Sequence, residues 1–174
     1  MAIPQAELIE FSRQQTTASL NESVKVAKSN SKQTAFLCHS HRDERLALGV
    51  QSWLHNQGWE LYIDWLDASM NSTPDKYTAQ KIQKHILSRD WFLYLATSNS
   101  TKSKWCPWEI GFADGAGKSG DIIVLRTSSK STTYGQEYLQ LYRFVSKTKI
   151  EDFRIFEAGA RQSGKSLSSL TRGF

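Results

Sequence analysis

Apolar runs that alternate with amphipathic segments constrain this chain more than any other feature of its sequence. Four runs have the length and composition of buried strands: Thr34–Cys38, Trp59–Ile63, Trp91–Ala96 and Asp121–Leu125. Segments with apolar residues at helical spacing lie between them. A parallel sheet produces this pattern, because each strand is followed by a helix that crosses and covers one face of the sheet. We therefore expect an α/β fold with a central, mostly parallel sheet and helices on both faces.

The pattern also divides the chain into three parts. Residues 1–32 are rich in Ser, Thr, Gln and Asn, and we expect a polar extension or one appended helix there. Residues 33–150 carry the alternating pattern and should form one domain, with a fifth strand near Tyr142–Ser146. Residues 151–174 are expected to form a C-terminal helix, from about Glu151, and a tail.

Two polar segments predict where helices start. Ser40-His-Arg-Asp43 follows the first strand and matches a capping box, with Ser40 as the N-cap and the Asp43 side chain reaching back to it. Thr73-Pro74-Asp75 predicts a later helix that has Pro74 at its first position.

Composition argues against several classes of protein. The net charge is +5, but Lys and Arg are scattered, so we expect no nucleic-acid partner. We find no signal peptide and no apolar run long enough to span a membrane, and we expect a cytoplasmic protein. The two cysteines, Cys38 and Cys106, lack metal-site spacing, so we expect no metal and read Cys38 as a core residue.

Ligands of parallel α/β sheets bind at the edge where the strands have their carboxyl ends. Three polar segments of this chain follow predicted strands and should meet there. They are Cys38–Asp43, Asp64–Thr73 and Thr97–Glu109. We expect a functional site to be assembled from these three segments.

The segment Ser103-Lys-Trp-Cys-Pro-Trp-Glu109 contains the residue with the clearest chemical potential. Pro107 lacks an amide hydrogen and belongs in the first turn of a helix, which places Glu109 near the helix N-terminus. The helix dipole there favours an ionised carboxylate by about 0.3–1 kcal/mol. Trp105 precedes Glu109 by four residues and shares its face of the helix.

An ionised carboxylate beside an aromatic ring suits a reaction in which positive charge develops on a sugar. Cleavage of the bond between ribose and a pyridinium base is such a reaction, because the base leaves without protonation. The alternative reading of these residues is structural, with Glu109 capping a helix beside core tryptophans.

At this point the sequence resembles the TIR (Toll/interleukin-1 receptor) domain family in its bacterial form. Ala35–Asp43 looks like the family's first box, an apolar strand followed by a polar segment and an acidic residue. Tyr62-Ile-Asp-Trp65 and the loop after it look like the second strand and the mobile loop of the family. Ser100–Ile110 looks like the segment that carries the catalytic glutamate of the NAD-cleaving members.

The resemblance implies a flavodoxin-like fold with five parallel strands, and a role for each matching residue. Glu109 is implied as the catalytic residue. The implied substrate contacts are His39, Ser40, His41, Asp64, Trp65 and Trp105. NAD is implied as the substrate, with no further cofactor. The enzymatic members split NAD at the nicotinamide–ribose bond and release linear or cyclic ADP-ribose.

The resemblance also extends to the signal-making subunit of the Thoeris antiphage defence system. It implies that the product, which we expect to be cyclic, activates a separate effector protein. It implies too that the enzyme stays latent until it assembles with copies of itself. Two other readings of the sequence remain open: a TIR adaptor that signals by assembly alone, and an enzyme resembling nucleoside deoxyribosyltransferases.

Overall fold

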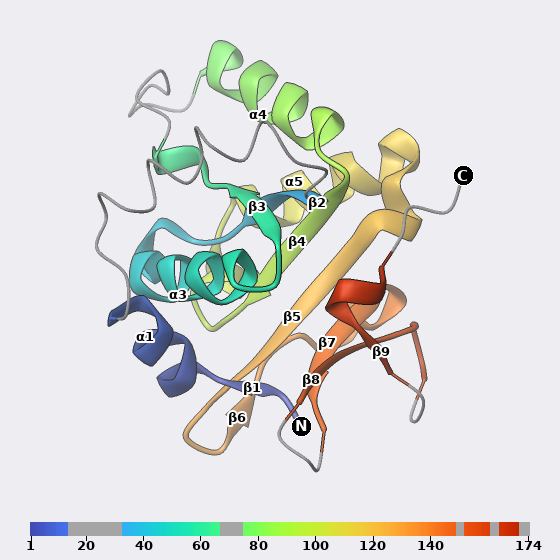
Figure 1. Cartoon of the computed structure of the whole chain (residues 1–174). Helices are drawn as coiled ribbons and strands as arrows, with labels where there is room; N and C mark the ends of the chain where they lie inside the picture. The colour runs from blue at the N-terminus through green and yellow to red at the C-terminus, as the bar shows by residue number, and fades with distance from the viewer. Residues whose placement is uncertain (14–32, 67–74, 149–151, 161–163, 171–174) are drawn as a thin grey trace.

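A central sheet with helices on both faces organises the chain, as the computed structural model in Figure 1 shows. The structure describes residues 1–13, 33–66, 75–148, 152–160 and 164–170, with Trp65 and Ser168 described by their backbone alone. Five strands run parallel in the order β3-β2-β4-β5-β7. Their bounds are Trp59–Tyr62, Gln33–Cys38, Trp91–Ala96, Ile122–Ser129 and Arg143–Lys147. The predicted parallel sheet is therefore confirmed, including its fifth strand.

Two layers of helices bury the two faces of this sheet (Figure 1). One face packs against α1 (Gln5–Arg13) and α3 (Glu44–His55), and the other against α4 (Lys76–Ser88) and α5 (Trp105–Ala113). The central strand β4 shows why the sequence run is apolar throughout. Its odd-numbered residues enter the core beneath α3, and its even-numbered residues enter the core beneath α4 and α5.

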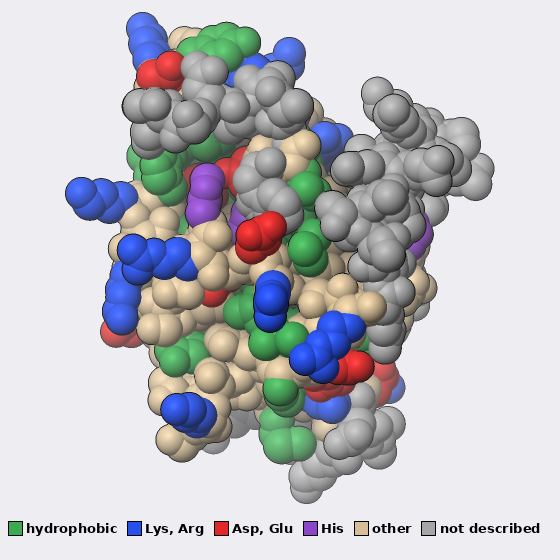
Figure 2. Space-filling model, turned by 90° about the vertical axis from the view of Figure 1, so that its left-hand side faces the viewer, with side chains coloured by type: hydrophobic (Ala, Val, Ile, Leu, Met, Phe, Trp, Pro, Cys, Tyr) green, Lys and Arg blue, Asp and Glu red, His purple; other side chains and the backbone are tan. Residues whose placement is uncertain are grey.

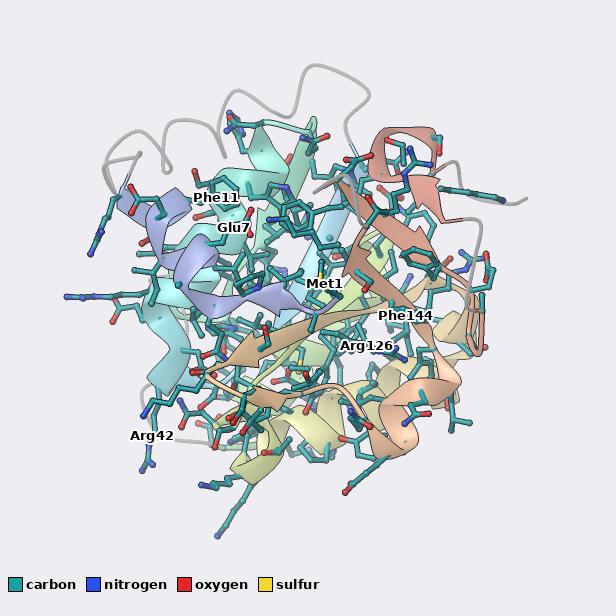
Figure 3. The ribbon with its side chains drawn as sticks, turned by 90° about the horizontal axis from the view of Figure 1, so that it is seen from below. Met1, Glu7, Phe11, Arg42, Arg126 and Phe144 are labelled. Carbon is teal, nitrogen blue, oxygen red and sulfur yellow. The ribbon has the colours of Figure 1, made fainter. Side chains whose placement is uncertain are left out.

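The first residues of the chain pack against this sheet. Strand β1 (Ile3–Pro4) lies parallel to β5, and the Glu7 carboxylate contacts the Lys147 ammonium at 3.0 Å. Figure 3 shows Met1, Glu7 and Phe11 from below. Helix α1 crosses α3 so closely that a Cβ atom on Gly49 would lie 1.9 Å from the Leu8 carbonyl oxygen. The appended helix expected in residues 1–32 is thus present at Gln5–Arg13, and residues 14–32 lie outside the described part.

The expected helix from about Glu151 is wrong. Beyond β7 the described residues form β8 (Phe153–Phe156) and β9 (Lys165–Ser166), both antiparallel additions to the sheet. Strand β5 pairs with one edge of β7, and Phe153-Arg-Ile-Phe156 pairs with the other edge and supplies apolar side chains to both faces of the sheet. Ile155 enters the core beneath α3, whereas Phe156 stacks on Phe144 with ring centroids 5.3 Å apart.

Short elements connect the long ones. These are β6 (Thr132–Thr133), the 3₁₀ turns η2 (His41–Asp43), η3 (Asp64–Leu66), η4 (Ser100–Lys102), η6 (Ser119–Asp121), η7 (Glu137–Leu141) and η8 (Leu167–Ser169), and the π-turn η5 (Asp114–Lys118). Strand β6 pairs antiparallel with β5. Gly58, with φ of 83°, ends the turn after α3, as a glycine at this position predicts.

Both predicted helix starts need correction. Ser40 does cap η2, since its hydroxyl accepts a hydrogen bond from the Arg42 amide at 3.4 Å, but the Asp43 side chain turns away from it to the loop after β4. Helix α4 begins at Lys76 with Asp75 as its N-cap, whose carboxylate accepts from the Thr78 amide at 2.7 Å. Pro74 therefore precedes the helix, and Thr73 and Pro74 lie outside the described residues.

Candidate active site

The carboxyl ends of β2, β3 and β4 meet at one edge of the sheet and bring together residues from three segments. His39 and His41 follow β2, Asp64 begins η3 after β3, and Glu109 lies in α5 after β4. Figure 2 shows histidine and acidic side chains gathered in one region of the surface, whereas Lys and Arg side chains are spread over this face. The sequence prediction of a site built from these segments is consistent with this arrangement.

Asp64 lies between the two histidines. Its carboxylate oxygens are 3.4 Å from Nε2 of His41 and 3.9 Å from Nε2 of His39, and the imidazole rings lie nearly parallel, 6.2 Å apart. The hydrogen bond with Asp64 raises the pKa of the exposed His41. Burial lowers the pKa of His39, although Asp64 acts in the opposite direction. At neutral pH the protonated form is therefore more favoured at His41 than at His39.

The His39 ring is fixed from below, because its Nδ1 lies 3.1 Å from the Leu37 carbonyl oxygen. This contact favours a proton on Nδ1, which leaves Nε2 facing Asp64. Ser40 is buried and its hydroxyl caps η2, so its role in the structure is to hold the turn between the two histidines.

Glu109 is almost completely buried, with only 4% of its surface exposed, and its Oε2 has no hydrogen-bond partner. Burial is the main reason that its pKa rises from 4.5 to about 8. Cys106 and Asp64 nearby raise this pKa further, whereas a hydrogen bond with Cys38 and the charge of His41 lower it. At neutral pH and without a ligand, the protonated carboxyl predominates.

The expectation that the helix dipole keeps Glu109 ionised is therefore wrong. Glu109 does lie in the second turn of α5, as predicted. The dipole contributes about 0.3–1 kcal/mol there, but the loss of water around a buried carboxylate costs more. A positive charge that arrives next to Glu109 would reverse this balance.

Two cysteines lie close to Glu109. The sequence predicted Cys38 as a core residue and gave no role to Cys106. Cys38 and Cys106 are both fully buried free thiols, and Cys38 Sγ lies 3.8 Å from the Cys106 carbonyl oxygen. Burial raises the pKa of the Cys38 thiol well above its usual range, so it stays neutral. Cys106 precedes Glu109 by three residues, and this helical spacing is the sequence signal that could have placed it beside Glu109.

Asp43 fixes the loop after β4 against the loop after β2. Its buried carboxylate accepts hydrogen bonds from Thr97 Oγ1 at 2.5 Å and from Asn99 Nδ2 at 2.6 Å. The Ser100 hydroxyl continues the network, since it accepts from the Thr97 amide at 2.8 Å. These bonds set the path of the chain that leads into α5. The local sequence pattern instead predicts that Asp43 caps a helix, which is why these hydrogen bonds were not expected.

The first turn of α5 carries Pro107, as predicted, and the Ser103 hydroxyl accepts hydrogen bonds from the amides of Trp105 and Cys106. The half-buried Trp105 ring meets Trp108 edge-on, with centroids 5.2 Å apart. It lies one turn before Glu109 and takes part in an aromatic row on the outside of the helix.

Part of the predicted site lies outside what the structure describes. The backbone of Trp65 lies in η3, next to Asp64, but its side chain is outside the described part, and so are residues 67–73 of the expected loop. Across the described ranges, no group of three or more His, Cys, Asp or Glu residues is placed to hold a metal ion. No helix in the same part of the chain has both the length and the apolar character needed to cross a membrane.

This arrangement can hold a cation. A buried carboxyl group that is neutral at rest becomes ionised when positive charge approaches, and the Asp64–His41 pair adds polar contacts at the rim. Both cysteine thiols are fully buried, which restricts the access that nucleophilic attack would need. Burial also keeps Cys38 neutral, whereas a hydrogen bond with Cys38 lowers the pKa of Cys106.

Comparison with known proteins identifies the family to which these residues belong. Residues 35–161 match the TIR domain. Over 118 residues the chain is 35% identical to the Bacillus cereus (strain MSX-D12) protein named Probable 3′ cyclic ADP-D-ribose synthase ThsB′. The match covers 66% of this chain and 61% of that protein, so the chain spans less than two thirds of the relative's length. Since the matched residues make up more than half of the chain and include Glu109, this chain belongs to the TIR domain family.

Proposed function

We propose that this chain cleaves NAD at the bond between nicotinamide and ribose and makes an ADP-ribose-derived signal, which is cyclic. One observation supports this proposal above all: a buried, unpartnered carboxyl oxygen of Glu109 at the carboxyl edge of the sheet. The name of the Bacillus cereus relative, a cyclic ADP-D-ribose synthase, points to the same chemistry.

Glu109 is the catalytic residue of this proposal. The nicotinamide ring of NAD is cationic, and its approach favours the ionised form of Glu109, which releases a proton. The bond between the ribose carbon and the ring nitrogen then breaks, and the electron pair leaves with neutral nicotinamide. The carboxylate stabilises the positive charge that develops on the ribose.

The two histidines, Ser40, Asp64, Trp65 and Trp105 form the substrate contacts of the proposal. Asp64 orients His41 through a contact of 3.4 Å, and the ring of His41 is exposed and free to meet the substrate. A protonated His41 suits the diphosphate of NAD. Trp65 and Trp105 suit the stacking of a base.

The fate of the ribosyl carbon decides the product. Attack by water gives linear ADP-ribose, and attack by an atom of the same ADP-ribose gives a cyclic product; each route releases one proton with nicotinamide. Cyclisation requires that water is kept out while the two ends of the molecule meet.

The aromatic row on α5 supports self-assembly on activation, because Trp108 remains 37% exposed and stacks on Phe112. The product activates a separate effector protein, and the free thiols Cys38 and Cys106 suit the reducing cytoplasm as the place of action.

The test is product analysis with a matched pair of variants. Purified protein is incubated with NAD and, separately, with deoxynucleosides, and chromatography resolves free base, linear ADP-ribose and cyclic products. The proposal predicts nicotinamide and a cyclic product from NAD, no activity in Glu109→Gln, and wild-type activity in Glu10→Gln, an exposed carboxylate remote from the site. Wild-type nicotinamide release by Glu109→Gln would refute the role of Glu109. Base release from deoxynucleosides alone would favour the transferase reading. No activity toward either substrate at protein concentrations where the chain self-associates would favour an adaptor.

A further inference from the structure

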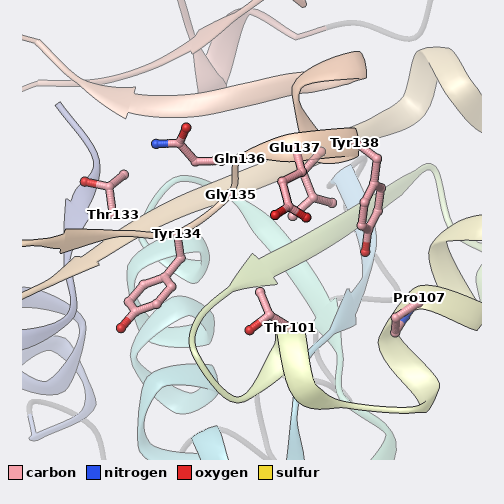
Figure 4. A pocket seen from close by; sticks show the side chains of 9 residues that line it. Thr101, Pro107, Thr133, Tyr134, Gly135, Gln136, Glu137 and Tyr138 are labelled. Atoms are coloured by element: carbon pink, nitrogen blue, oxygen red, sulfur yellow. The ribbon is translucent and has the colours of Figure 1, made fainter.

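A pocket of about 440 Å³ opens beside the first turn of α5 and is not used by the proposed reaction (Figure 4). Its walls come from η4, from α5 and from the segment that runs from β6 into η7. The polar and aromatic side chains that line it belong to Thr101, Thr133, Tyr134, Gln136, Glu137 and Tyr138. This volume lies within the range of small-molecule sites.

The pocket is separate from the site at Glu109. Pro107 lines the pocket and precedes Glu109 by two residues in α5. Two residues correspond to about 200° around a helix, so Pro107 and Glu109 face nearly opposite directions. The pocket therefore lies on the other side of the first turns of α5 from the catalytic carboxyl group.

The backbone that forms one wall of the pocket packs closely against the sheet. Gly135, with φ of 99°, rests directly on β4 and β5, because a Cβ atom there would lie 2.7 Å from Arg126 Cγ. The Arg126 guanidinium stacks in turn on the Phe144 ring at 3.5 Å, and Figure 3 shows these two residues together. The neighbouring Leu139 is buried, and the Tyr134 amide donates to the Thr127 carbonyl at 2.8 Å. The wall is preformed rather than dependent on a ligand.

The side chains of the wall remain accessible. Tyr138 is 44% exposed, and its hydroxyl hydrogen-bonds with the buried Tyr94, which holds the ring in place. Figure 4 shows Tyr134 and Tyr138 on either side of Thr101. Glu137 holds a left-handed backbone conformation, with φ of 59°, that residues other than glycine rarely adopt. The pocket thus presents the rings of Tyr134 and Tyr138 together with hydroxyl, amide and carboxylate groups.

The chemistry of these groups defines the ligand class. Tyrosine rings stack on flat heteroaromatic bases, and the Glu137 carboxylate accepts hydrogen bonds from a ribose diol or an exocyclic amine. Among the described residues that line the pocket, Glu137 carries the only charge, so a phosphate would meet no cation there. We propose that this pocket binds an uncharged nucleoside at a site distinct from the NAD site.

The inference goes beyond the proposed activity and is tested by binding alone. Adenosine, AMP and choline are titrated by calorimetry into the full chain carrying Glu109→Gln, so that no substrate is turned over. We expect saturable binding of adenosine, binding of AMP that is weaker by about tenfold or more, and no binding of choline. Tyr138→Ala, which removes the stacking ring, should weaken the binding of adenosine by roughly tenfold or more. Tyr77→Ala, which removes an exposed tyrosine of α4, should leave binding unchanged.

Glu137→Gln provides the sharper variant, since it keeps the size of the side chain and removes the charge. This variant should bind adenosine more weakly and should show a smaller preference for adenosine over AMP. Thermal melting of each variant establishes that it is folded. The inference is overturned if adenosine does not bind, if choline or AMP binds as tightly, or if Tyr138→Ala and Glu137→Gln, both folded, bind adenosine like the parent.

Discussion

At the scale of single residues, the charge state of Glu109 is set by burial and not by its position in the helix. The sequence places the residue correctly in the second turn of α5 but gives no measure of how deeply it is buried. With a pKa of about 8, the carboxyl group is neutral in the resting protein. In the proposed reaction a cationic substrate supplies the charge that ionises it, and selectivity for a pyridinium nucleotide follows from the same burial that raises the pKa.

Burial of Glu109 should lower the stability of the fold at alkaline pH. The pKa of this group is raised from 4.5 to about 8, so the unfolded chain loses the proton first and stability falls as pH rises between these values. Glu109→Gln removes this titration. We expect the variant to be more stable than wild type by about 2 kcal/mol or more near pH 8, where the difference in pKa acts almost fully. Near pH 4 the two proteins should be similar.

Chemical denaturation at the two pH values measures this difference. Glu10→Gln is the control, because Glu10 is exposed and pairs only with the surface residue Arg13 within α1. Equal stability of wild type and Glu109→Gln at both pH values would contradict a buried, neutral Glu109.

At the scale of elements, the contact between α1 and α3 ties the first residues of the chain to the TIR fold. Gly49 leaves no room for a side chain, because its Cβ would overlap the Leu8 carbonyl group. Gly49→Ala should destabilise the protein by roughly 1–3 kcal/mol, although alanine favours a helix. Gly111→Ala in α5 is the matched control, since nothing lies within 4 Å of its Cβ position. It should be neutral or stabilise the protein by about 0.5–1 kcal/mol.

Urea denaturation of the two variants beside wild type decides the point. A loss of stability confined to Gly49→Ala would support close packing of α1 on α3. If both variants gained stability, α1 would not be held against α3 as the structure places it.

Local patterns predicted the elements with regular periodicity and missed those that depend on distant partners. Buried strands such as β2 and β4 were predictable, because their apolar runs are long and bounded by polar segments. Strand β8 was not, because Phe153–Phe156 becomes a strand by pairing with β7. Asp43 was misassigned for the same reason: its partners Thr97 and Asn99 lie more than fifty residues away in the chain.

At the scale of the whole molecule, the site lies where the parallel strands β2, β3 and β4 have their carboxyl ends. Three separate segments contribute to it, and the order of strands brings them together, so the sequence could predict the edge but not the distances across it. The direction of pKa shifts was likewise beyond the sequence, because it depends on burial within the folded chain. The resemblance to TIR domains singled out Glu109, and its burial fits the role that we propose for it.

Self-assembly should control activity. If activation requires copies of the chain to associate, NAD cleavage per molecule should rise with protein concentration or with a crowding agent. Trp108→Ala, which removes an exposed ring from α5, should weaken this dependence, whereas Tyr77→Ala on α4 should not. Light scattering and nicotinamide release are measured on the same samples. High activity that is independent of concentration, in a protein shown to be monomeric, would contradict control by assembly.

The pH dependence of kcat/KM for nicotinamide release tests the central claim most directly. This quantity reports the ionisation of the free enzyme, in which Glu109 has a pKa of about 8. Under conditions where the protein is active, kcat/KM should rise from about pH 6 and level off above about pH 9, with its midpoint near 8. The midpoint for kcat should be lower, because bound NAD favours the carboxylate. A kcat/KM profile that is flat over this range, as for a carboxylate titrating at its ordinary value of 4.5, would contradict the account.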